Sequence, residues 1–293
     1  MLAGAGRKGG FCSALKLAAR ERKVRVSIKL MNIEQGGGRH ALTESRRRQE
    51  LLAEIRNGNF DLVVAIPPGS TFSRATSANA LGPKPVRSRL YPRGLPWLKG
   101  KQLDRVKAAN NMVDFLIKAL SAQLDVDNAM AILEHPEDLG SSGRRWDPAS
   151  IWVWPEVLRL LDKKDTVTGA LRQGDIGAAS SRPTRLLARL RGVEGIMEIG
   201  MPELDSDGNY LGPLKPMRKS DKLALTGKQG NKFVTAQAAA WAPGLCEHLA
   251  TLAVEAYFNP VNQPMVPLAE GEELDIGITE GEVEDVVAYG EKA

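Results

Sequence analysis

Residues 61–75, with the sequence DLVVAIPPGSTFSRA, combine the features of a ligand-binding loop. A short apolar run ends at Pro67-Pro68, and the small residues Gly69 and Ser70 follow. Ligands in open α/β sheets bind beyond the carboxyl ends of the strands, so this loop is expected to face a site. The alternative interpretation is a rigid Pro-Pro turn with structural serines.

A carboxylate follows a second apolar run, 129–133, in the sequence Glu134-His135-Pro136. An acid at the carboxyl end of a strand is well placed to accept hydrogen bonds from the edge of a nucleic-acid base. The alternative is a solvated acidic turn, and His135 on its own is interpreted as a structural histidine.

Glycines are concentrated at residues 4–10, directly before an expected helix. A glycine turn at a helix N-terminus lets the backbone approach a nucleotide-like ligand, which makes Gly4 and Gly6 candidate cofactor contacts. Almost no chain precedes these glycines, so the first strand is expected to be truncated. A flexible N-terminus is the alternative.

The segment 84–107 is strongly basic, with Asp104 as its single acid. Its cations are Lys84, Arg87, Arg89, Arg93, Lys99, Lys101, Arg105 and Lys107. Tyr91 and Trp97 are interleaved with them, so the segment suits a phosphate backbone and stacked bases. The alternative is a solvated linker. The candidate nucleic-acid contacts are Ser73, Arg74, Arg87, Arg89, Arg93, Lys99 and Lys101.

The charge of the chain is uneven. Nine of its 35 acids but one of its 40 Lys and Arg residues lie in 270–293, so the remainder is more basic than the net charge of +5 indicates. A basic body favours a polyanionic partner, most often nucleic acid. The alternative is a soluble basic surface with no specific partner. The acidic segment 261–293 is expected to be a disordered tail.

Composition excludes several other classes. Cys12 and Cys246 are the only cysteines and there are three scattered histidines, so neither a disulfide scaffold nor a metal site is expected. No apolar run is long enough to span a membrane, and the first residues lack the apolar stretch of a secretory signal. The expected location is intracellular, and nuclear if the chain binds DNA in a eukaryotic cell.

These segments require an α/β frame to position them, and apolar runs do alternate with helical patterns along the chain. The expected strands are 24–31, 61–66, 129–133, 166–171, 185–190 and 195–199. The expected helices are 11–22, 43–56 with Thr43 as N-cap, 103–124, 149–161 and 235–258, the last interrupted near Pro243. The predicted fold is a Rossmann-like doubly wound sheet, mainly parallel, over residues 1–194. A helical and irregular C-terminal extension, 195–260, is expected to pack on it.

The order of these motifs resembles that of the DNA cytosine-5 methyltransferases over about residues 1–190. Pro67, Pro68, Phe72 and Ser73 match a family strand that ends in Pro-Pro-Cys and is followed by Phe-Ser. Leu133-Glu134-His135-Pro136 looks like a variant of the Glu-Asn-Val segment. The pieces GPKPVRSRLYPRGLPWL, EHPEDLG, PASIW and RPTRLL look like a divergent group associated with mobile elements.

The resemblance implies a fold that binds S-adenosylmethionine and a pocket that holds the target cytosine. The implied cofactor contacts are Gly4, Gly6, Asn32, Pro67 and Pro68. The implied pocket residues are Glu134, Arg182 and Arg185, with Gly69 at the position of the nucleophilic cysteine.

Departures from the family pattern predict a pseudoenzyme. Gly69 has no thiolate to attack the cytosine ring, and Ser70 or Ser73 would be poor substitutes without a base. Asn32 and Ala41 stand where acids would suit the cofactor, so the cofactor itself is expected to be bound weakly or lost. The expected function is a cytosine-5 methyltransferase-like protein that is impaired or inactive and still binds nucleic acid.

Two alternatives stay open. The first is an active S-adenosylmethionine-dependent methyltransferase that acts on an exocyclic nitrogen or on RNA. Residues 66–69 lack the polar and aromatic residues of the loop found in adenine-type enzymes. The second is a non-catalytic interaction protein.

Overall fold

A central sheet of seven strands organises the protein in the computed structural model. The structure describes residues 2–3, 10–31, 42, 44–78, 83–143, 147–216, 228–229, 232–233 and 240–259. The predicted tail 261–293 lies outside them. The strands of the sheet are β1 (Leu2–Ala3), β2 (Leu30–Met31), β3 (Leu62–Ala65), β4 (Met130–Pro136), β5 (Val167–Arg172), β6 (Pro183–Arg189) and β7 (Glu198–Ile199).

The strand order is β2-β1-β3-β4-β6-β5-β7. Strands β2, β1, β3 and β4 pair in parallel, whereas β6 pairs antiparallel with both β4 and β5. Strand β5 therefore runs in the same direction as β4, and β7 runs against it. The α/β class is confirmed, and the sheet is mixed, with five of its seven strands running one way.

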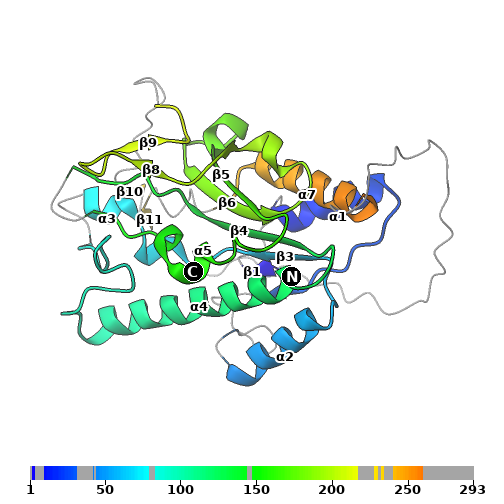
Figure 1. Ribbon diagram of the computed structural model, residues 1–293, viewed down its shortest axis with the longest axis horizontal. Coiled ribbons are helices and arrows are strands. Elements are labelled where there is room, and N and C mark those ends of the chain that lie inside the picture. The colour runs from blue at the N-terminus through cyan, green and yellow to red at the C-terminus, as the bar shows by residue number, and fades with distance from the viewer. Residues whose placement is uncertain are drawn as a thin grey trace.

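Helices cover both faces of the sheet (Figure 1). They are α1 (Phe11–Glu21), α2 (Ser45–Arg56), α3 (Arg74–Ala78), α4 (Gly100–Leu124), α5 (Pro155–Leu158) and α7 (Pro243–Phe258). Short 3₁₀ turns are η1 (Gly69–Thr71), η2 (Ile151–Val153), η3 (Gln173–Ile176) and η4 (Val193–Ile196). Two small ribbons add β8 (Glu203–Leu204) with β9 (Tyr210–Gly212), and β10 (Lys228–Gln229) with β11 (Lys232–Phe233).

Alternating side chains of the central strands divide the core into two layers. Val63 and Ala65 of β3 pack with α2, α4 and α5, whereas Val64 packs with α1 and α7. Leu133 and Ile132 of β4 alternate in the same way. Because both faces are buried, the strands appear in the sequence as continuous apolar runs. Helix α7 packs with α1 in the same core cluster, so the last described helix covers one face of the sheet together with the first.

Several expected elements are shorter than predicted. The strand expected at 24–31 pairs only at Leu30–Met31, because its neighbour β1 is two residues long and offers no partner for residues 24–29. The helix expected at 149–161 is reduced to η2 and α5, because the ring of Pro155 cannot continue a helix and begins a new one. Helix α2 begins at Ser45 with Glu44 as N-cap, and Thr43 lies outside the described residues.

The strand expected at 195–199 is reduced to β7, because Val193–Ile196 form the turn η4. The helix expected at 235–258 is confirmed as α7 from Pro243 onward, and residues 235–239 lie outside the described residues. The other predicted strands and helices are confirmed with shifts of a few residues at their ends. In the described ranges, no helix combines the length and the apolar character that crossing a membrane requires.

Candidate functional site

The Pro-Pro loop and the Glu134 segment lie next to each other at the carboxyl ends of β3 and β4. Ala65 pairs with Leu133, so the two motifs leave the sheet from the same level. Pro67 is buried and Pro68 half-buried, and the chain then turns through η1. A Cβ atom built on Gly69 would lie 3.9 Å from both Cδ and Cγ of Pro136. Position 69 therefore faces the Glu134 segment and has room for a side chain.

Glu134 is buried on the face of the sheet that α1 and α7 cover. Its Oε1 atom lies 3.7 Å from Nη2 of Arg182 and forms no hydrogen bond within the described part of the chain. Burial raises the pKa of the Glu134 carboxyl, and the charge of Arg182 opposes that rise. A buried carboxyl oxygen that forms an ion pair but no hydrogen bond is a group that a ligand donor could satisfy.

Arg182 and Arg185, expected to act together, lie apart. Arg182 has a left-handed backbone (φ 38°) and donates to the carbonyl of Ala240, just before α7. Arg185 pairs with His135 across β4 and β6, whereas Glu134 faces Leu186. Opposite residues of an antiparallel pair share a face, so Arg185 lies on the other face of the sheet from Glu134.

Arg185 is held by residues that the sequence patterns did not single out. Its Nε and Nη2 donate to Glu137 at 2.7 and 2.9 Å, and its Nη1 donates to Thr168 Oγ1 at 3.1 Å. The hydroxyl of Tyr210 also donates to Glu137, at 3.0 Å. Glu137 belongs to the EHPEDLG segment, but nothing in the sequence marks its partners, which lie 48 and 73 residues away.

His135 is packed among rings and is not available as a base. Its ring centroid lies 5.1 Å from that of Phe72, edge to face, and neither ring nitrogen has a hydrogen-bond partner among the described residues. Burial, with a contribution from the charge of Arg87, lowers its pKa to about 3. Neither Ser70 nor Ser73 is therefore activated by this histidine.

The basic segment divides into structural and exposed cations. Arg87 is buried and donates to Thr71 Oγ1 at 3.0 Å and to Asn110 Oδ1 at 2.7 Å, over the ring of Phe72. Arg93 lies over the ring of Trp154, 3.9 Å from its centroid. Burial lowers the pKa of Arg87 to about 10. These two arginines stabilise the fold of the segment.

Two arginines of the basic segment also form ion pairs, whereas its lysines are exposed. Arg93 pairs with Asp114 at 3.1 Å and with Glu156 at 3.2 Å. Arg89 pairs with the buried Asp138 at 2.5 Å. Lys99 and Lys101 are exposed, as are Lys84 and Lys107.

Tyr91 and Trp97 form an exposed aromatic pair on the same segment. Their ring centroids are 6.0 Å apart, and 37% and 53% of their surfaces are exposed. Large exposed rings on a basic segment are typical of surfaces on which nucleic-acid bases stack.

A pocket of about 310 Å³ lies beyond the ends of β4 and β5. It is lined by Arg74, Leu139, Ser141, Arg172, Pro183, Asn209, Tyr210, Leu211, Leu214, Lys215 and Pro216. Arg74 donates to the carbonyls of Gly140 (2.6 Å) and Ser141, which fixes the rim. Ser73 precedes it and is half-buried, and its carbonyl accepts a hydrogen bond from the Thr76 hydroxyl at 2.7 Å.

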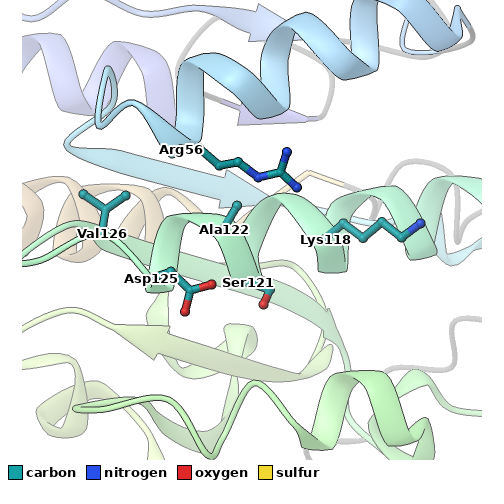
Figure 2. A pocket seen from close by; sticks show the side chains of 6 residues that line it. All are labelled: Arg56, Lys118, Ser121, Ala122, Asp125 and Val126. Carbon is teal, nitrogen blue, oxygen red and sulfur yellow. The ribbon is translucent and has the colours of Figure 1, made fainter.

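A second pocket, of about 390 Å³, lies between α2 and α4 (Figure 2). It is lined by Arg56, Lys118, Ser121, Ala122, Asp125 and Val126. Helix α4 ends here shortly before β4 begins, so this pocket is at the opposite edge of the sheet from the Pro-Pro loop. It holds none of the residues predicted to bind a ligand.

The predicted cofactor contacts Gly4, Gly6 and Asn32 lie outside the described residues, as does Ala41. Met31 at the end of β2 and residues 66–70 after β3 carry no carboxylate for ribose hydroxyls. These described residues do not supply what the family uses for S-adenosylmethionine. No group of three or more potential metal ligands occurs in the parts of the chain that the structure describes.

Comparison with known proteins adds no relative. No protein-family model matches the chain, and no curated protein matches it in sequence. The functional interpretation therefore depends on the geometry of the site and on the motifs themselves.

Proposed function

We propose that this protein is a cytosine-5 DNA methyltransferase-like domain that has lost methyl transfer and retains nucleic-acid binding. The observation that carries the proposal is the contact between its two diagnostic motifs. Position 69 of the Pro-Pro loop faces Pro136, two residues after the buried Glu134. A nucleophile on one segment and a base-holding acid on the other would have to meet in this way.

The strand order supports a Rossmann-like, doubly wound fold. The chain runs from β1 to β2 on one side and then to β3 on the other, so the order reverses at β1. Ligands of open α/β sheets bind beyond the strand ends at such a reversal. The Pro-Pro loop follows β3, which is adjacent to β1.

The loss of catalysis follows from what occupies this site. Gly69 has no thiol, and among the described residues no histidine forms a hydrogen bond with the neighbouring serines. Neither Met31 at the end of β2 nor residues 66–70 after β3 provide an acid for the cofactor. The backbone does not require glycine at position 69, because its φ is not in the left-handed region and no atom crowds a Cβ.

Nucleic-acid binding is supported by the exposed half of the basic segment. Lys84, Lys99, Lys101 and Lys107 are exposed, and the Tyr91–Trp97 pair lies between Lys84 and Lys99 in the sequence. Ammonium groups would contact phosphates and the rings would stack on bases. DNA is the expected polymer because the resemblance is to DNA-modifying enzymes.

The test measures two affinities. Fluorescence anisotropy with duplex and single-stranded DNA between about 50 and 200 mM salt should show binding that weakens steeply as salt rises. Calorimetric titration with S-adenosylmethionine should show no binding in the micromolar range, where the binding free energy would be about 8 kcal/mol. Absence of DNA binding at low salt overturns the proposal that nucleic-acid binding is retained. Methyl incorporation into nucleic acid by the unmodified protein overturns the proposal that catalysis is lost.

A further inference from the structure

The charged side chains that line the pocket beyond β4 and β5 are all positive. Arg74, Arg172 and Lys215 line it, and none of its lining residues is acidic. Two acids outside the lining, Asp138 and Asp147, act on Arg74, and Asp138 is already paired with Arg89 at 2.5 Å. A concave surface lined by cations and lacking a carboxylate concentrates anions.

Arg172 has an unsatisfied donor at this site. Its Nη2 donates to the Lys215 carbonyl, which ties the end of β5 to the segment after β9. Its Nε is buried and has no partner among the described residues. A buried donor without an acceptor among the described residues is a group that a ligand acceptor could satisfy.

The remaining lining residues are largely apolar. Leu139 and Leu211 contribute to the rim, and Leu214 is buried beneath it. Tyr210 fixes this wall, because its hydroxyl accepts from the Leu214 N–H at 3.1 Å and donates to Glu137 at 3.0 Å. The β8–β9 ribbon that carries the wall lies at the upper left of Figure 1.

We infer that this pocket binds a phosphate ester, with the phosphate between Arg172 and Lys215 and the sugar or base against the leucines. Its volume of about 310 Å³ is at the lower end of ligand pockets and suits one nucleotide unit. Two sources carry this chemistry, a free mononucleotide and a nucleotide unit of a nucleic-acid strand. The inference depends on the proposed function only for the second source.

The first experiment is a calorimetric titration with deoxycytidine 5′-monophosphate, with deoxycytidine as the matched ligand that lacks the phosphate. The monophosphate should bind and the nucleoside should not. Lys215→Gln should weaken monophosphate binding about tenfold, as expected for one charge-assisted contact, and Lys215→Arg should restore it. Lys215 is exposed, so the change removes charge without opening the fold.

Lys118→Gln is the control, because Lys118 is a cation of the pocket at the opposite edge of the sheet (Figure 2). It should leave monophosphate binding unchanged. Equal binding of nucleoside and monophosphate, or a Lys215→Gln variant that binds the monophosphate as the wild type does, overturns the inference.

The second experiment identifies the source with a short single-stranded oligonucleotide. If a strand supplies the phosphate, Lys215→Gln should reduce the salt slope of binding by about 0.7, the value for one phosphate contact on a single strand. DNA binding that Lys215→Gln leaves unchanged, with no binding of the monophosphate, overturns the pocket and leaves the proposed function intact. Monophosphate binding that depends on Lys215, with no DNA binding at low salt, supports the pocket and overturns the proposed function.

Discussion

Arg185 donates to both carboxylate oxygens of Glu137, and both side chains are fully buried. The contact joins β6 to the segment after β4, and Thr168 and Tyr210 extend it to β5 and β9. The sequence predicts Arg185 in a ligand pocket, whereas the geometry gives it a structural role, because its partner Glu137 also holds Tyr210 of the pocket beyond β4 and β5. Removing one partner of a buried pair leaves an uncompensated charge.

Glu137→Gln is therefore expected to lower the free energy of unfolding by about 3–5 kcal/mol, measured by urea denaturation. The double variant Glu137→Gln with Arg185→Met should lose less than the single variant, because no buried charge is left unpaired. Asp125→Asn breaks the exposed pair with Lys163 and serves as the control, with little change. A Glu137→Gln protein as stable as the wild type would show that Arg185 does not depend on this partner.

Gly69→Cys tests whether the missing thiol is the only defect. The nearest atoms to an added Cβ are 3.9 Å away, so the free energy of unfolding should change by no more than about 0.5 kcal/mol. Methyl transfer to DNA from radiolabelled S-adenosylmethionine should stay at background, because the cofactor side also lacks its acids. Robust methylation by this variant would contradict the proposal that cofactor binding has been lost as well as the thiol. Gly69→Ser is the control without a thiol.

The two classes of cation in the basic segment should respond in opposite ways. Arg87→Met leaves the acceptors on Thr71 and Asn110 without a donor, and should cost at least about 2 kcal/mol of stability in thermal or urea unfolding. Lys99→Gln and Lys101→Gln should leave stability unchanged and reduce the salt slope of duplex DNA binding by about 1 each.

The opposite pattern, a stable Arg87→Met protein and lysine variants with the wild-type salt slope, would mean that the exposed lysines do not contact phosphates. Lys118→Gln controls for a general effect of net charge on DNA binding, since Lys118 lies at the other edge of the sheet.

The strands that carry the candidate site were predictable because burial on both faces leaves a continuous apolar run. Residues 61–66 and 129–133 became β3 and β4 for this reason, and the proline and glutamate that end those runs mark the edge where the motifs meet. That adjacency follows from parallel pairing alone, since neighbouring parallel strands present their carboxyl ends together.

Pairing between distant residues was not predictable. The insertion of β6 antiparallel between β4 and β5 decides that Arg185 shares a face with His135 and not with Glu134. Burial of Arg87 depends on the ring of Phe72 and on Asn110 of α4, neither of which is adjacent in sequence. A run of cations indicates charge, but only the tertiary contacts separate those that support the fold from those that face solvent.

The buried imidazole of His135 should make stability depend on pH. Its pKa is about 3 in the folded protein, against 6.5 in an unfolded chain. Between these values the unfolded chain binds a proton that the folded chain excludes, so the free energy of unfolding falls as pH falls below 6.5. The slope is up to about 1.4 kcal/mol per pH unit, and the effect is absent above 6.5.

The test is the free energy of unfolding in urea at about pH 7 and about pH 5, measured for the wild type and for His135→Leu. The difference between the two proteins separates the effect of the histidine from that of the carboxylates that titrate in the same range. His135→Leu should lose less stability on acidification than the wild type does. His248→Leu, a change at an exposed histidine of α7, should keep the wild-type slope. If His135→Leu also keeps that slope, protonation of His135 does not oppose folding, and the ring must reach water or a partner through an opening of the Phe72 contact.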